Sequence, residues 1–159
     1  VYGVLVYMTI YLFMTVGTFA VLLALRRRGQ SLEQIDDFAG LGKDHPMLAL
    51  ATAVFMFSLA GIPPLAGFFG KLYVFIAAVE AGLVWLAVVG VLTSVVGAYY
   101  YLRIVKLVYF DTAPEALDRG IDPELRGVIA VSALVTALFV VVPGPILGTA
   151  RVAAGALFP

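Results

Sequence analysis

The chain has 159 residues, of which 63% are hydrophobic and only 13% charged, and its mean hydropathy is +1.07. Soluble domains are about half apolar and about a quarter charged, so this composition excludes an ordinary soluble domain and a disordered chain. Ten basic residues balance ten acidic ones, which leaves no basic face to attract nucleic acid. The absence of cysteine excludes disulfides and thiolate-bound metal clusters in this sequence.

Seventeen of the twenty charged residues fall in two windows, 26–45 and 103–126. The other three are Lys71, Glu80 and Arg151. Long uncharged stretches separate these positions, and each is close to or above the roughly 20 residues that a spanning helix needs. They cover 1–25, 46–70, 81–102 and 127–150. The pattern predicts an all-α polytopic membrane protein with about four transmembrane spans, one of them discontinuous.

In chain order, the first predicted span covers 1–25 and ends at a run of three arginines. A short interfacial helix is expected over 31–42, with Ser31 as its N-cap, because apolar residues recur there at helical spacing. The remaining expected elements are a broken span over 46–82, a span over 84–110, a span over 124–142 and an amphipathic tail over 143–159.

The apolar segment 46–82 is too long for one straight helix and short for two crossings. Split at Pro63 and Pro64, its halves would reach roughly 25 Å and 28 Å. One crossing places both charged windows on the same side, with eight basic residues there against Arg151 opposite, whereas two crossings divide the eight evenly. Because cytoplasmic flanks collect Lys and Arg, we expect a single span built from two half-helices and broken at 61–67.

The break is expected at the run GIPPLAGFFGK, residues 61–71. Proline lacks an N–H group and biases the preceding residue out of the helical region, and glycine lowers helix propensity. Broken backbone at membrane depth is tolerated only where protein or a water-filled cavity satisfies its polar groups, and transporters place ion sites at such breaks. The residues expected to form the break are Gly61, Pro63, Pro64, Gly67 and Gly70.

Lys71 closes this run and is followed by about two turns of apolar helix. An ammonium near the bilayer centre costs about 2.5–3.5 kcal/mol on insertion scales, so it persists mainly where water or a carboxylate receives it. Lys71 is therefore the candidate proton relay, and the alternative is an interfacial lysine whose ammonium reaches water. Glu80 lies nine positions further on, on the opposite face of a regular helix, so the partner of Lys71 must come from elsewhere.

Three further residues are weaker candidates. His45 is expected to be a solvated boundary residue, with proton entry as the alternative, and Glu80 a solvated helix end. Tyr100, within a run of three tyrosines, is expected to anchor at the membrane interface, with a quinone contact as the alternative. Ser58 is expected to bond back to its own helix, with a bound water as the alternative, and Met14 to serve packing. One histidine makes no metal site, and no nucleotide or flavin motif is present, so no cofactor site is expected here.

Four stretches of sequence carry a resemblance to a known family. They are YLFM at 11–14, GLGK at 40–43, MFSLAGIPPLAGFFGK at 56–71 and YYYLR at 99–103. Because of these stretches, residues 1–145 resemble the C-terminal part of the antiporter-like subunits of proton-pumping NADH:quinone oxidoreductase, respiratory complex I. In that family the L type carries a Ser-Lys-Asp run at the position of Lys71 and the M type a glutamate, whereas GKLY at 70–73 and the tyrosine run favour the N type.

The resemblance implies a family fold of two inverted five-helix repeats with one broken helix in each. It implies that Lys71 matches the lysine of the family's central hydrophilic axis, and that the four predicted spans are the eleventh to fourteenth helices. The first repeat, with its glutamate and lysines, is not contained in this sequence.

The resemblance also implies a non-redox, proton-translocating part of an enzyme complex in a bacterial inner membrane. NADH, FMN, iron–sulfur clusters and quinone are expected in other subunits, with no cofactor in this chain. Expected partners are the lipid bilayer and other membrane subunits, above all neighbouring antiporter-like subunits, with no nucleic acid. A subunit of a multisubunit cation/proton antiporter and a purely structural membrane module remain as alternatives.

Overall fold

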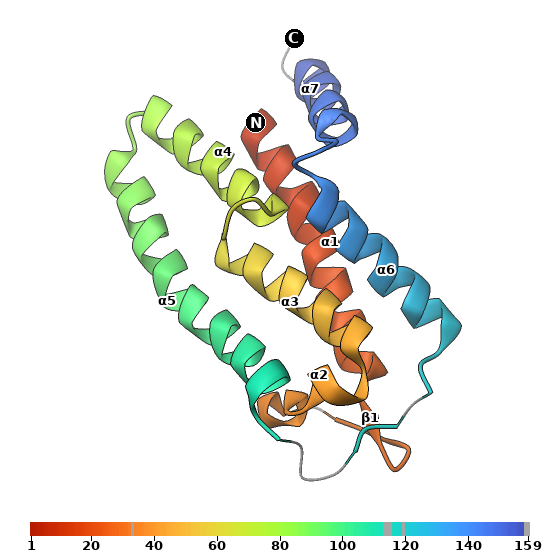
Figure 1. Ribbon diagram of the computed structural model, residues 1–159. Helices are drawn as coiled ribbons and strands as arrows, with labels where there is room; N and C mark the ends of the chain where they lie inside the picture. The colour runs from red at the N-terminus through yellow and green to blue at the C-terminus, as the bar shows by residue number, and fades with distance from the viewer. Residues whose placement is uncertain (33, 113–115, 119, 158–159) are drawn as a thin grey trace.

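The computed structural model describes residues 1–32, 34–112, 116–118 and 120–157, and these are mainly helical (Figure 1). The α-helices are α1 Tyr2–Ala24, α2 Leu41–Asp44, α3 Pro46–Ala60, α4 Ala66–Glu80, α5 Val84–Phe110, α6 Pro123–Leu138 and α7 Gly144–Leu157. Between α1 and α2 lie the antiparallel strands β1 Arg26–Arg27 and β2 Gln30–Ser31 and the 3-10 helix η1 Ile35–Phe38. Glu33, Glu115 and Arg119, three members of the charged windows, lie outside the described residues.

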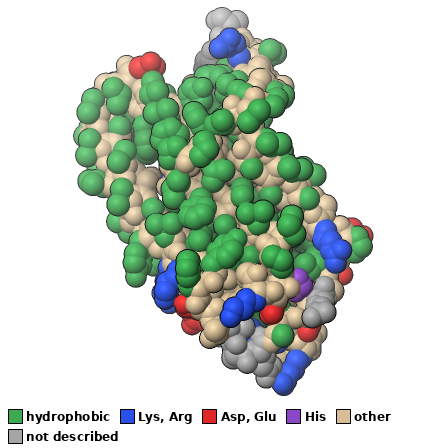
Figure 2. Space-filling view, viewed as in Figure 1, with side chains coloured by type: hydrophobic (Ala, Val, Ile, Leu, Met, Phe, Trp, Pro, Cys, Tyr) green, Lys and Arg blue, Asp and Glu red, His purple; other side chains and the backbone are tan. Residues whose placement is uncertain are grey.

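Within the described part of the chain, α1 and α5 are the helices that are long and apolar enough to cross a bilayer singly. The helix α1 nearly fills the predicted span 1–25, and α5 coincides with the predicted 84–110. Large apolar side chains of α5, such as Trp85 and Val95, point away from the rest of the bundle and are about two-thirds exposed. Figure 2 shows hydrophobic side chains over most of the visible face. This surface suits contact with lipid or with neighbouring membrane helices.

The expected discontinuous span consists of α3 and α4, with non-helical backbone at 61–65. Gly61 ends α3 with φ of 85°, a left-handed conformation that suits a residue without Cβ. Pro63 and Pro64 follow and supply no N–H groups. The break is shorter than the predicted 61–67, because helical geometry resumes at Ala66 and includes Gly67 in the first turn of α4.

The half-helices pack against opposite halves of α1. Gly17, in the second half of α1, lies against the ring of Phe55 in α3, whereas Gly3, near its start, lies against Tyr73 of α4. Accordingly, α3 runs from the lower end of the bundle to its middle and α4 from the middle to the upper end (Figure 1). The segment 46–82 therefore traverses the bundle once, in agreement with the single broken span. The number of membrane crossings itself stays a prediction.

The two charged windows meet at one end of the bundle. The carboxylate of Asp118 accepts hydrogen bonds from the backbone N–H groups of Arg28 and Gly29, at 3.0 Å and 2.7 Å. Arg103 lies 3.8 Å from Asp36 across the same end. Charged side chains gather at this lower end in Figure 2, with isolated charges at the upper end. Both windows thus share one side, which is what a single traverse by 46–82 requires.

The interfacial helix predicted over 31–42 is wrong, and Ser31 is not an N-cap. Arg28 and Gly29 both have positive φ, 54° and 76°, and they turn the chain between β1 and β2, so Ser31 is a strand residue. Gly40, with φ of 77°, then separates η1 from α2. The spacing of apolar residues does not reveal these interruptions of the helix. They depend on the positive φ angles at Arg28, Gly29 and Gly40.

The last predicted span, 124–142, ends early. The helix α6 starts with Pro123 in its first turn, where a missing N–H costs nothing, but it ends at Leu138. Its 16 residues extend for about 24 Å. The valines at 140–142 precede Pro143, which disfavours helical geometry at the residue before it. The tail expected over 143–159 forms the helix α7 within its described part.

Candidate functional site

The C-terminus of α3 is half-buried at mid-length of the bundle, and its terminal carbonyl groups need hydrogen-bond partners. The N–H of Ile62 donates to the carbonyl of Phe57 at 3.0 Å, and the N–H of Gly61 donates to the carbonyl of Ser58 at 2.9 Å. These two bonds form the pair expected of a Schellman motif. They do not reach the last two carbonyl groups of the helix.

Lys71, in the second turn of α4, reaches those two carbonyl groups. Its Nζ donates to the carbonyl of Leu59 at 2.9 Å and lies 3.5 Å from the carbonyl of Ala60. The carbonyl end of a helix carries about half a negative elementary charge, which attracts an ammonium. In the part of the chain that the structure describes, Lys71 forms no ion pair with a carboxylate. Its partner is therefore the broken backbone itself.

Glycines allow this close approach at the break. A Cβ built on Gly61 would lie 3.3 Å from Cδ of Lys71, and the φ of 85° at Gly61 is unfavourable for other residues. A Cβ built on Gly70 would lie 3.3 Å from the ring of Tyr7 in α1. The predicted motif thus brings Gly61 and Lys71 together and presses Gly70 against α1, whereas Pro63 and Pro64 are exposed.

A second set of contacts joins three helices beside the same break. The hydroxyl of Ser58, which has 0% exposure, donates to Sδ of Met14 at 2.9 Å. The same oxygen accepts a hydrogen bond from the N–H of Gly67 at 2.9 Å. A Cβ on Gly67 would overlap the carbonyl oxygen of Ser58. Because Met14 lies near the middle of α1, these contacts place the break and Lys71 at mid-length of the bundle.

The expectation for Ser58 is wrong, whereas Met14 is buried in the core as expected. Ser58 was expected to bond back within its own helix, as Thr52 does to the carbonyl of Leu48 at 2.8 Å. Instead its hydroxyl crosses to α1 and α4, and Met14 is a hydrogen-bond acceptor as well as a packing residue. The signal in the sequence was a serine in an apolar run three residues before Gly61, but its partners are distant in sequence.

The weaker candidates lie elsewhere. Nε2 of His45 is 3.0 Å from the carbonyl oxygen of Asp118 at the charged end of the bundle, and the 15 residues of α3, about 22 Å of helix, separate it from the break. His45 is not freely solvated there; it lines a cavity of about 700 Å³ between α3 and α6 together with Arg126. Tyr100 is 56% exposed on α5 and packs edge-on against Tyr99.

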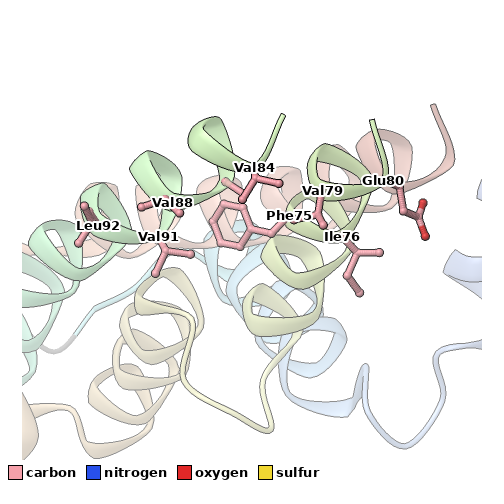
Figure 3. Close-up of a pocket in the computed structure, with 9 residues that line it drawn as sticks. Phe75, Ile76, Val79, Glu80, Val84, Val88, Val91 and Leu92 are labelled. Atoms are coloured by element: carbon pink, nitrogen blue, oxygen red, sulfur yellow. The ribbon is translucent and has the colours of Figure 1, made fainter. Parts of the chain in front are cut away.

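Glu80 lies at the end of α4, far along the helix from Lys71. It borders a groove of about 480 Å³ between α4 and α5 that is otherwise lined by apolar side chains, and its carboxylate points away from the ring of Phe75 (Figure 3). Among the described residues, no group of three or more His, Asp or Glu side chains is placed to hold a metal ion. Of the predicted site residues, all of which lie in the described part of the chain, only Lys71 and the glycines make close contacts at the break.

Comparisons with known proteins identify the family of this chain. A family model described as the transmembrane region of NADH:quinone oxidoreductases and Mrp antiporters matches residues 1–97. NADH-quinone oxidoreductase subunit N of Paramagnetospirillum magneticum is 55% identical over 99% of this chain, and that of Rhodospirillum rubrum is 59% identical over 98%. Each match covers 32% of the relative, so the chain spans about a third of the length of these curated relatives.

A solved structure agrees with the sequence relatives. Respiratory complex I from Thermus thermophilus with bound aureothin contains a chain that matches with a TM-score of 0.78 and 33% sequence identity, over 90% of this chain and 33% of that chain. The match confirms the all-α polytopic membrane fold. The curated relatives confirm the resemblance to the N type that the sequence motifs indicated.

Proposed function

Because the chain belongs to the transmembrane family of NADH:quinone oxidoreductases and Mrp antiporters, we propose that it serves in proton translocation by NADH:quinone oxidoreductase. In this proposal Lys71 is a proton relay, and the chain itself holds no redox centre. NADH, FMN, iron–sulfur clusters and quinone are bound by other subunits, whose electron transfer supplies the energy. This chain then acts in the enzyme as a non-redox part of the proton translocase.

The contact between Lys71 and the carbonyl of Leu59 carries the proposal. It holds a titratable amine at mid-length of the bundle, where a charge is costly unless polar groups receive it. The carbonyl groups of Leu59 and Ala60 are available to the ammonium only because the helix is broken there. A change of charge or geometry elsewhere in the complex alters the energy of the ammonium at this place, and this drives uptake or release of its proton.

Cation/proton antiport is the second candidate, since the family description names both classes of protein. The curated relatives favour the first, because eight of them, at 53–59% identity, are named NADH-quinone oxidoreductase subunit N. In a purely structural role Lys71 would only cap the end of α3, and an assembled Lys71→Met complex would then pump protons normally. In our proposal the partners are the bilayer and other membrane subunits, above all neighbouring antiporter-like ones, in a bacterial inner membrane that the chain crosses several times.

Affinity purification of the complex that contains this chain tests the proposed class. We expect the tagged complex to carry NADH:quinone reductase activity, flavin fluorescence and the spectroscopic signals of iron–sulfur clusters. Reconstituted vesicles should acidify when NADH and quinone are supplied. A purified assembly of membrane subunits alone, with sodium/proton exchange and no NADH oxidation, would instead assign the chain to the antiporters.

Cysteine labelling tests the proposed topology, and residues 1–159 contribute no cysteine of their own. Cysteines at Gln30 and Ala116, both exposed at the charged end, should react with an impermeant thiol reagent from the cytoplasmic side. A cysteine at Ala81, in the turn between α4 and α5, should react from the opposite side; Ala81 is preferable to Gly82, whose φ is 76°. Labelling of positions 30 and 116 from different sides would refute the single crossing of 46–82.

A further inference from the structure

Two side chains join the half-helices at the break, and they act in opposite directions. Lys71 of α4 binds the terminal carbonyl groups of α3, whereas Ser58 of α3 accepts a hydrogen bond from Gly67 at the start of α4. A side-chain oxygen that accepts from the second N–H group of a helix does the work of an N-cap. Leu65, which occupies the N-cap position of α4, makes no such side-chain bond. Each half-helix therefore caps the exposed end of the other.

We propose that Ser58 is the positioning residue for Lys71, an inference that rests on the proton-relay function proposed above. The hydrogen bond from Gly67 to Ser58 fixes the first turn of α4 against the last turn of α3. Lys71 follows Gly67 by four residues, so the two lie on the same face of α4, one turn apart. The position of the amine over the carbonyl of Leu59 thus depends on the bond that Ser58 makes.

The hydroxyl group of Ser58 is held in position by contacts with two other helices. Its hydroxyl is fully buried, donates to Sδ of Met14 in α1 and accepts from Gly67 in α4. A sulfur acceptor is weak but polarizable, and here it anchors the hydroxyl to a third helix. The close approach of Gly67 leaves no room for a Cβ. Three helices therefore hold this oxygen, and removal of the hydroxyl leaves a buried N–H group without its acceptor.

The two caps respond differently to proton transfer. The attraction between Lys71 and the α3 carbonyl groups weakens when the amine loses its charge. The bond between Ser58 and Gly67 involves no charge and persists. Ser58 thus keeps the half-helices in register while Lys71 is neutral, so that the amine regains the same position when it is protonated again.

The test compares Ser58→Ala with Thr52→Val in the intact complex. Both changes remove a buried hydroxyl from α3, but among the described residues the hydroxyl of Thr52 bonds only to its own helix, at Leu48. We expect Ser58→Ala to lower proton pumping about two- to tenfold, as loss of one buried hydrogen bond allows. The pH of half-maximal pumping should shift by about half a unit or more. Thr52→Val should leave both quantities unchanged.

A double-mutant cycle separates positioning from general stability. In a Lys71→Met background, Ser58→Ala should lower the residual pumping no further, because there is no amine to position. An equal loss in both backgrounds, or a Ser58→Ala complex that behaves like Thr52→Val, would overturn this inference alone. Normal pumping by Lys71→Met would refute the relay, and the inference about Ser58 with it.

If Ser58→Ala prevents assembly of the complex, the Ser58→Cys variant tests the proposal instead. Its sulfur is a weaker acceptor for the N–H of Gly67 and adds little volume, so an intermediate shift of the pH profile is expected. A Ser58→Cys complex whose pH profile equals that of the unchanged complex would overturn the proposal.

Discussion

Replacing Lys71 by methionine in the intact complex should lower proton pumping at least about tenfold while the complex still assembles. Methionine keeps a long flexible side chain but removes the amine that binds the carbonyl of Leu59. Lys71→Arg should also impair pumping, because a guanidinium keeps its proton. NADH-driven proton uptake into vesicles and quinone-reductase turnover, measured together, show whether electron transfer slows with pumping.

Lys106→Met is the matched control for this experiment. Lys106 is also a lysine and lies at the charged end of α5, where its Nζ is 3.4 Å from Asp111 and its side chain is 68% exposed. An exposed ion pair of this kind contributes about 0–1 kcal/mol, so pumping should be unchanged. Normal pumping by an assembled Lys71→Met complex would eliminate Lys71 as a required relay and leave it as a structural cap on the end of α3.

Gly67→Ala should cause the largest structural damage of any single methyl group added at the break. The new Cβ would overlap the carbonyl oxygen of Ser58, which is backbone and cannot rotate away. Overpacking of this kind costs about 1–3 kcal/mol or more, and here it also separates the half-helices. We expect a clear loss of assembled complex, and a lower melting temperature of whatever assembles.

Gly97→Ala is the control, since it adds the same methyl group to the middle of α5. Its Cβ would lie 3.7 Å from the ring of Tyr101, an ordinary van der Waals contact. Alanine also favours a helix over glycine by about 1 kcal/mol, so assembly should be kept or improved. Equal yield and melting temperature for the two variants would contradict the close contact between Gly67 and Ser58.

The weaker site residues show where sequence reasoning reached its limit. Glu80 was separated from Lys71 by helix geometry alone, and the structure places it at the far end of α4. For His45, neighbouring residues suggested a solvated boundary, but Asp118, 73 positions away, provides a hydrogen-bond partner. Counting residues along a helix predicts the relative position of two side chains that share that helix. It does not predict a contact with a residue that lies far away in the sequence.

By itself, the sequence determined the two long helices, the presence of a break after α3 and the meeting of both charged windows at one end of the bundle. Length and hydropathy define α1 and α5, prolines and glycines stop α3 at Gly61, and counting basic residues favoured one traverse by 46–82. Each of these properties depends on neighbouring residues or on a sum over a segment, so it can be predicted without knowing how the helices pack.

Only the tertiary structure decided what surrounds Lys71 and Ser58. Their contacts join residues 12, 9 and 44 positions apart, and these pairs meet because α3, α4 and α1 pack around one break. Likewise, positive φ angles at Arg28 and Gly29 form a hairpin that Asp118 holds from far along the chain, so that Ser31, the predicted helix N-cap, lies in a strand. Such contacts depend on which backbone groups a break leaves unpaired and on which side chains the packing brings to them.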